Sequence, residues 1–164
     1  MNSSEDFVIV LAEDDPGHAR LIEKGLRAII ANPLVRFGNG KDALDYLRRE
    51  EQASQRHLLL LDLNMPVMDG YQVLRHLKAD PRTVRIPVIV LTTTDDPAER
   101  CYDLGCADCV VKSSDWSQLN EAVRRARMTP LNGLGLESPE AAQAARAACL
   151  LNPVAHASRV RAHW

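Results

Sequence analysis

The feature that most constrains the fold of this chain is a short apolar run that ends in a carboxylate. Residues 58–61 are all leucine, and Asp62 follows them directly. An unbroken apolar run of this length, bounded by turn residues, is typical of a strand buried on both faces of a parallel sheet. Asp62 would then lie at the carboxyl end of that strand, where open α/β sheets place their ligand sites. Because aspartate also caps turns and helices, this segment alone leaves a purely structural role open.

Similar apolar runs recur along the chain, and each is followed by an amphipathic stretch. Strands are expected at residues 7–12, 34–37, 58–61, 86–91 and 109–111. The helices that follow them are expected at residues 16–30, 41–49, 71–78, 97–105 and 115–128. Five rounds of strand and helix predict an α/β fold, a doubly wound five-stranded parallel sheet with helices on both faces.

Two of these helices have a clear start signal. Asp15 and Pro16 suit the N-cap and the first helical position, and Asp96 and Pro97 repeat the pair. In the first helix the apolar residues recur at roughly helical spacing, which predicts that they face the core. These residues are Leu21, Ile22, Leu26, Ile29 and Ile30.

The character of the chain changes after residue 128. Residues 129–139 are rich in glycine and proline, and residues 140–151 are rich in alanine. We expect one domain at residues 1–128 and a C-terminal extension at 129–164. The extension would hold at most one short helix and no separate output domain.

Composition narrows the class of protein. Of the 164 residues 46% are hydrophobic, which suffices for a core, and the net charge of −2 gives no support to a nucleic-acid binder. No apolar run is long enough to cross a bilayer, and the N-terminus does not resemble a secretory signal. We therefore expect a cytoplasmic protein with neither nucleic acid nor membrane as a partner.

Chemically capable side chains follow four of the expected strands. Glu13 and Asp14 follow the first, Asp62 the third, Thr92 the fourth and Lys112 the fifth. The carboxyl ends of parallel strands share one edge of the sheet, so these side chains can converge. Three clustered carboxylates repel one another unless a cation joins them, and oxygen ligands of this kind suit Mg²⁺. A lysine and a hydroxyl beside the metal can bind a phosphoryl group.

Four motifs in this order closely resemble the receiver domain of bacterial two-component response regulators. They are AEDD at 12–15, LLDLNMPVMDG at 60–70, VLTTT at 90–94 and VVK at 110–112. The resemblance covers about residues 7–127 and implies the flavodoxin-like receiver fold. It also implies a signalling protein that catalyses only its own phosphorylation and slow dephosphorylation, with a sensor histidine kinase as phosphodonor.

The resemblance assigns a role to each motif residue. Asp62 is similar to the phosphoacceptor, which forms an aspartyl phosphate. Asp14 resembles the direct Mg²⁺ ligand and Glu13 a ligand that acts partly through water, while Asp62 and the backbone carbonyl of Asn64 complete the metal site. Thr92 is similar to the switch hydroxyl, and Lys112 resembles the residue that pairs with the phosphate.

Within the family the chain is most similar to stand-alone regulators of bacterial phytochrome histidine kinases. This similarity implies a phytochrome kinase as partner, an unknown downstream protein, and a possible homodimer. The family commonly uses its fourth helix, fifth strand and fifth helix for such contacts.

The chain departs from the family pattern at two positions. Cys109 stands where the family usually has an aromatic residue, which puts the coupled aromatic switch in doubt. Ser113 replaces the proline that commonly follows the lysine. A cis bond before a non-proline residue costs about 3 kcal/mol, so we expect either a trans peptide with a rearranged loop or a strained bond.

Other functions stay open at this stage. A lone receiver domain can also serve as a phosphate sink or as a relay intermediate. A Mg²⁺-dependent phosphohydrolase is a second alternative, and it needs an acid/base aspartate two residues after the nucleophile. This chain has Asn64 at that position, which argues strongly against substrate turnover. The spacing of Cys106 and Cys109 matches a redox motif. We nevertheless expect both cysteines to be buried, inert thiols. The five histidines are scattered, and none is expected at the strand ends.

Overall fold

The computed structural model describes residues 7–52, 54–94, 97–113 and 116–128. Its described part contains one five-stranded sheet in the order β2-β1-β3-β4-β5, with all neighbouring strands parallel. The strands are β1 (Val8–Ala12), β2 (Leu34–Phe37), β3 (His57–Asp62), β4 (Val88–Thr92) and β5 (Asp108–Val111). The helices are α1 (Pro16–Arg27), α2 (Gly40–Leu47), a 3-10 turn η1 (Glu50–Gln52), α3 (Gly70–Ala79), α4 (Ala98–Asp103) and α5 (Ser117–Met128). The predicted fold class is confirmed.

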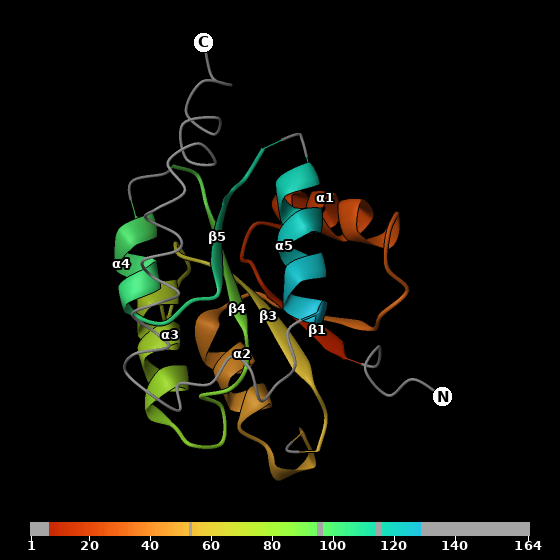
Figure 1. The fold of residues 1–164 in the computed structure, drawn as a ribbon. Helices are drawn as coiled ribbons and strands as arrows, with labels where there is room; N and C mark the ends of the chain where they lie inside the picture. The colour runs from red at the N-terminus through yellow and green to blue at the C-terminus, as the bar shows by residue number, and fades with distance from the viewer. Residues whose placement is uncertain (1–6, 53, 95–96, 114–115, 129–164) are drawn as a thin grey trace. The chain divides into compact units, whose positions relative to one another are not determined.

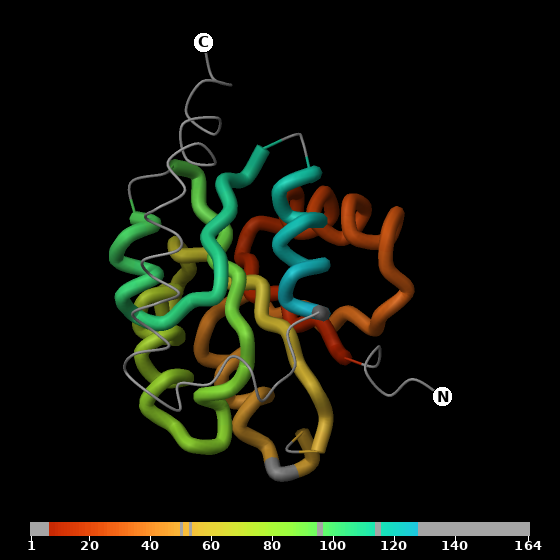
Figure 2. Tube along the Cα trace, viewed as in Figure 1, coloured from red at the N-terminus to blue at the C-terminus, as the bar shows by residue number. Residues whose placement is uncertain are grey.

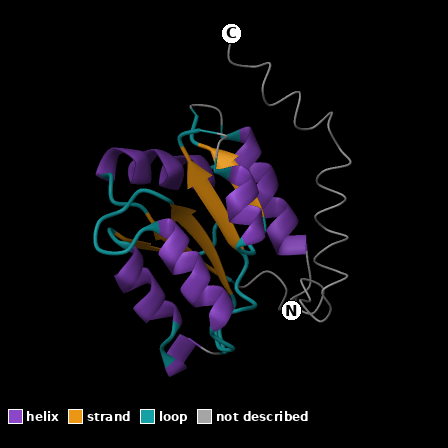
Figure 3. Cartoon of the chain, turned by 90° about the vertical axis from the view of Figure 1, so that its left-hand side faces the viewer, coloured by secondary structure: helices purple, strands orange, loops and turns teal. Residues whose placement is uncertain are grey.

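The buried apolar residues of the strands divide between two cores because successive side chains point to opposite faces of the sheet. Val10 and Leu61 face α2, α3 and α4, whereas Leu11 and Leu60 face α1 and α5. The sheet therefore lies between two layers of helices, as Figure 1 and the turned view in Figure 3 show. All five residues of β1 and all six of β3 are buried, which explains why the apolar runs are unbroken.

Side-chain caps fix where two helices begin. The Asp15 carboxylate accepts a hydrogen bond from the backbone N–H of His18, as expected for the N-cap of α1. At α3 the caps are reciprocal, because Asp69 accepts from the backbone of Gln72 while the Gln72 side chain accepts from the backbone of Asp69. Each such cap stabilises a helix by about 1 kcal/mol. Both helices start within a few residues of a strand's carboxyl end, so the caps also shape that edge.

Several predicted boundaries were wrong by a few residues. α1 ends at Arg27 instead of residue 30, because the backbone N–H groups of Ile29 and Ile30 both turn back to the Leu26 carbonyl. β4 begins at Val88, two residues later than predicted, and α4 begins at Ala98, with Pro97 as its N-cap residue.

The prediction that Leu21 faces the core was also wrong. Its side chain is 53% exposed, whereas Ala19, Ile22 and Leu26 are buried. The buried residues are three and four positions apart, so they share one side of the helix. Leu21 precedes Ile22 by one residue, about 100° around the helix axis, and points away from the core.

The two departures from the family pattern have structural outcomes. No cis peptide bond occurs among the described residues. The Lys112–Ser113 bond is therefore trans, which is one of the two outcomes expected for it. Cys109 is buried in the core beneath α4 together with Cys101 and Cys106, as expected for thiols without a surface role.

Two further expectations concern membranes and the C-terminal extension. Among the described helices, none is both long enough and apolar enough to cross a membrane. The predicted extension at 129–164 and its helix at 140–151 lie outside the described residues. Figure 2 follows the described chain from β1 to the end of α5.

One buried titratable group makes the stability of this fold dependent on pH. Burial lowers the pKa of the His57 imidazole, which is 5% exposed and lies with Nε2 3.2 Å from Gln52 Oε1. Below the ordinary pKa of 6.5 the unfolded chain binds a proton that the folded chain resists. The free energy of unfolding must therefore fall as the pH drops through that value, by at most about 1.4 kcal/mol per pH unit.

We predict that His57→Gln reduces this pH dependence, measured as the difference in unfolding free energy between about pH 7.5 and about pH 5.5 in urea titrations. His76→Gln is the matched control, because it removes a histidine that is exposed on α3. An unchanged pH dependence in His57→Gln would contradict the prediction.

Candidate functional site

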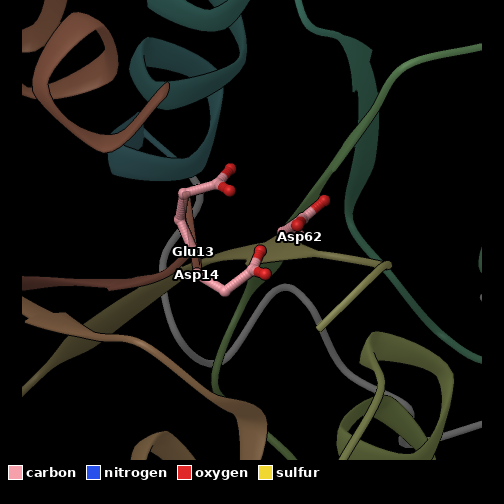
Figure 4. A group of neighbouring side chains, drawn as sticks. All are labelled: Glu13, Asp14 and Asp62. Carbon is pink, nitrogen blue, oxygen red and sulfur yellow. The ribbon is translucent and has the colours of Figure 1, made fainter. Parts of the chain in front are cut away.

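Three carboxylates meet at the carboxyl edge of the sheet. Glu13 and Asp14 follow β1, and Asp62 ends β3, so the group lies between the two strands where the strand order reverses. One oxygen from each carboxylate lies within 4.8 Å of the others. Figure 4 shows all three side chains around one space. The predicted convergence of these residues is therefore confirmed.

The three carboxylates differ in their exposure to solvent. Glu13 is fully buried and Asp62 is 4% exposed, whereas Asp14 lies on the exposed side of the group. A cation held here would be shielded from solvent on the sides of Glu13 and Asp62, and water would reach it on the side of Asp14. Oxygen donors with room for water are the ligand set that Mg²⁺ and Mn²⁺ accept, so the residues present fit a hard divalent cation.

Lys112 supplies a positive charge to the same group. Its Nζ lies 2.6 Å from Glu13 Oε2 and 3.1 Å from Asp62 Oδ1, and its side chain is 10% exposed. Burial acts to lower the pKa of Lys112, but the contacts to Glu13 and Asp62 outweigh it and the net pKa is raised. The ammonium therefore stays protonated and bridges two buried carboxylates.

The pKa of Asp62 is raised above its usual value. Burial is the main cause and the neighbouring Glu13 charge the second, while Lys112 and the backbone N–H of Asn64 act in the opposite direction. A second cation beside Asp62 would favour the ionised carboxylate further. The electrostatics of the site thus favour a bound cation.

Hydrogen bonds at the start of α1 hold Glu13 in place. The backbone N–H of Asp15 donates to Glu13 Oε1 at 3.1 Å, and the Asp15 carboxylate caps the helix. The three-carboxylate group found among the described residues does not include Asp15.

His18 is a site neighbour that sequence reasoning missed. Its Nδ1 lies 3.9 Å from Glu13 Oε1, and its side chain is 49% exposed. His18 belongs to α1 and not to a strand end, so its side chain approaches Glu13 from the helix. Its position three residues after the Asp15 cap, in the first turn of α1, was the available signal. Arg36 also reaches the edge, where its Nη2 donates to the Glu13 carbonyl at 3.4 Å.

Thr92 is buried at the end of β4, but its hydroxyl is engaged within its own loop. Oγ1 donates to the Thr94 carbonyl at 2.9 Å and accepts from the Thr94 backbone N–H at 3.2 Å. The Thr92 carbonyl accepts from the Lys112 backbone N–H at 2.7 Å, so β4 and β5 are joined at this edge. Asn64 lies exposed in the loop after β3.

The loop that follows Asp62 folds back onto the backbone of Asp62. The Gly70 N–H donates to the Leu63 carbonyl at 2.9 Å, and a Cβ added at Gly70 would lie 2.4 Å from the Asp62 carbonyl oxygen. Only glycine allows this close approach, because the atom in the way belongs to the backbone. Gly70 therefore fixes the position of the strand end that carries the Asp62 carboxylate.

We predict that Gly70→Ala lowers the free energy of unfolding by about 2 kcal/mol or more, since the clash forces the backbone at Asp62 to shift. Gly38→Ala is the control, because a Cβ there meets no atom within 4 Å, and a change within about 0.5 kcal/mol is expected. Urea unfolding of both variants measures the difference. Equal losses in the two variants would contradict the role given to Gly70.

Comparisons with known proteins agree with this geometry. Residues 9–124 match the family model described as the response regulator receiver domain. The response regulator Rcp1 of Synechocystis is 34% identical over 128 residues, which cover 74% of this chain and 87% of that protein. Its structure in a Mn²⁺-bound form is also similar, with a TM-score of 0.59 over 73% of this chain and 90% of that chain.

Two other solved structures share the fold. A response regulator receiver domain from Rhodospirillum rubrum is 42% identical with a TM-score of 0.61, covering 74% of this chain and 91% of that chain. The phosphorylated cyanobacterial phytochrome response regulator RcpA is 38% identical with a TM-score of 0.62 at the same coverage. The match to the family model spans most of the chain, and the acidic group lies where the strand order of the sheet reverses. This chain therefore belongs to the family of response regulator receiver domains, the signalling proteins that work with sensor histidine kinases.

Proposed function

We propose that this protein is a single-domain response regulator that accepts a phosphoryl group on Asp62 in a Mg²⁺-dependent reaction. The observation that carries the proposal is the placement of Asp62 against both a second buried carboxylate and the Lys112 ammonium. Glu13, Asp14, Asp62 and the backbone carbonyl of Asn64 would hold the metal. When bound, Mg²⁺ would neutralise charge on the oxygens of the transferred group.

The proposed transfer needs no catalytic base. An Asp62 carboxylate oxygen attacks the phosphorus of a phosphohistidine, an O–P bond forms, the P–N bond breaks, and the imidazole leaves with the electron pair. Lys112 Nζ, 3.1 Å from Asp62 Oδ1, is in reach of a phosphoryl oxygen on that carboxylate. Positioning and charge neutralisation are the main requirements of such a transfer, and the site supplies both.

The proposed signal begins with a change of partner for Thr92. Its hydroxyl now donates to the Thr94 carbonyl. A phosphoryl group on Asp62, on the neighbouring strand, would offer a charged acceptor, and charge-assisted hydrogen bonds are about twice as strong as neutral ones. The loop after β4 would then rearrange and alter the surface around α4, β5 and α5. On this proposal the protein signals by a change of surface and has no turnover of a substrate.

We further propose a phytochrome-type histidine kinase as the phosphodonor. The support is similarity alone, since the relative RcpA is described as a phytochrome response regulator. A downstream protein or a second copy of this chain would bind the altered surface. The cytoplasm is the proposed location, because Cys101 and Cys109 are thiols within the core, as reducing compartments allow.

Residues 1–128 are proposed as the receiver unit and residues 129–164 as an extension. The family match ends at residue 124 and α5 ends at Met128, so both boundaries support a unit that closes with α5.

The first test is intact-protein mass after incubation with acetyl phosphate and Mg²⁺. We predict a single phosphoryl adduct on the wild type and on a chain shortened to residues 1–128. No adduct is expected on Asp62→Asn or in the presence of a chelator, because the nucleophile or the cation is then missing. An adduct that persists in Asp62→Asn would place the acceptor elsewhere. Absence of any adduct would overturn the proposed function.

The partner is tested by kinetic preference among kinases. We predict that an autophosphorylated phytochrome-type histidine kinase transfers its phosphoryl group to this chain at least about tenfold faster, in kcat/KM, than kinases of other sensor classes do. Asp62→Asn serves as the blank. Equal rates across the panel would contradict the phytochrome assignment and leave the acceptor chemistry intact.

A further inference from the structure

The carboxylate of Asp108 connects three elements at one edge of the sheet. β5 is an end strand of the sheet, with α4 over one face and α5 over the other (Figure 1). Asp108 is the first residue of β5, and a side chain at the end of an edge strand can reach helices on both faces. The Tyr102 hydroxyl of α4 donates to Asp108 Oδ1 at 3.1 Å, and the Arg125 guanidinium of α5 pairs with Asp108 Oδ2. One carboxylate therefore binds a side chain from each of the two helix layers.

The backbone of β5 takes part in the same group of contacts. The Cys109 N–H donates to Asp108 Oδ1 at 2.9 Å and to the Tyr102 hydroxyl oxygen at 3.3 Å. Arg125 Nη1 also lies 3.2 Å from Glu121 Oε1, one turn earlier in α5. The Asp108 side chain is only 13% exposed, so these hydrogen bonds are largely protected from water. We call Tyr102, Asp108 and Arg125 the polar hub.

The two ends of α4 are held unequally. At its C-terminal end Tyr102 belongs to the polar hub, and the Gly105 N–H donates to the Tyr102 carbonyl at 3.0 Å. At its other end the helix begins at Ala98 after Pro97, and no side chain caps it. The helix has six residues, less than two turns, so it moves as one piece. A displacement of its first turn, which follows the loop after β4, is therefore felt at the hub.

Apolar packing alone gives no direct link between α4 and α5, because the two helices pack into separate cores on opposite faces of the sheet. The hub supplies that link around the edge strand. Hydrogen bonds weaken steeply when their angle or length changes, so a shift of the Tyr102 hydroxyl alters its bond to Asp108. The Asp108 carboxylate then changes its contact with Arg125. Cys109, which lacks the usual aromatic side chain, is bonded through its N–H to an aromatic residue of α4 instead.

We propose that the polar hub couples α4 to α5, so that a movement of α4 caused by a phosphoryl group on Asp62 reaches α5 through Tyr102 and Asp108. This inference rests on the proposed function, since it requires that phosphorylation moves the loop after β4. Tyr102 is then a positioning residue with no part in the chemistry at Asp62. The surfaces of α4 and α5 change together, and a partner that recognises the altered state can read both.

The test uses two hub variants and one control. Tyr102→Phe removes the hydroxyl and keeps the ring, and Asp108→Asn weakens the pair with Arg125 because the charge is lost. Tyr46→Phe is the matched control, because Tyr46 lies in α2 and the loss of its hydroxyl leaves the hub intact. Hydrogen exchange with mass spectrometry follows each helix before and after incubation with acetyl phosphate and Mg²⁺. Intact-protein mass ensures that all chains are compared at an equal extent of phosphorylation.

In the wild type and in Tyr46→Phe we expect phosphorylation to change the exchange of residues 98–107 and of residues 117–128. In both hub variants the change at 98–107 should remain, while the change at 117–128 should fall at least about twofold, because one bond of the hub is missing. If Asp108→Asn folds poorly, Tyr102→Phe decides the test.

A full response of α5 in Tyr102→Phe would overturn the inference. Loss of the α4 response in Tyr102→Phe would also overturn it, since Tyr102 would then act within α4 and not between helices. The same holds for an equal loss in Tyr46→Phe. If the wild type takes up a phosphoryl group and α5 does not respond, the inference fails and the proposed acceptor chemistry stands. If the wild type takes up none, the proposed function fails and this inference fails with it.

Discussion

The ion pairs of Lys112 are the interaction on which the rest of the site depends. Two carboxylates that are almost fully buried lie against one ammonium, at 2.6 Å and 3.1 Å. Burying three charges is costly, and removing one partner of such a group destabilises a protein by about 3–5 kcal/mol. The arrangement is therefore poor as a device for stability. On the proposed function, the arrangement suits a site that must receive further negative charge.

The fold provides the stability that the site does not. Two apolar cores, one on each face of the sheet, hold the strands in a fixed register, so the carboxyl ends of β1, β3, β4 and β5 stay aligned. Close backbone packing then sets the finer position of the groups. Gly70 lies against the Asp62 carbonyl, and the Lys112 N–H is bonded to the Thr92 carbonyl. The side chains of the site lie at one edge of the sheet, beyond the apolar packing that stabilises it.

The fold class and the convergence of the carboxylates could be predicted from the sequence. Both follow from the spacing of the apolar residues and from the order of strands and helices along the chain. Apolar runs of strand length alternate with amphipathic stretches, and parallel strands bring their carboxyl ends together whatever the loops do. Features that depend on the rotation of a helix or on the path of a turn were not predicted. Leu21 and His18 are examples, because a rotation of α1 decides whether each faces core, pocket or solvent. The left-handed φ of Val67 is another, since the residue type itself argues against it.

The unequal contacts of Lys112 suggest how the site chemistry and the signal are linked. Lys112 lies closer to Glu13 than to Asp62, and the Thr92 hydroxyl is bonded to Thr94. On the proposed function, a phosphoryl group on Asp62 competes for both. A shift of Lys112 toward that group and a turn of Thr92 away from its loop would both act on strands that are already hydrogen-bonded to each other. On this proposal, neutralising the new charge and moving the surface of β4 and β5 are one event.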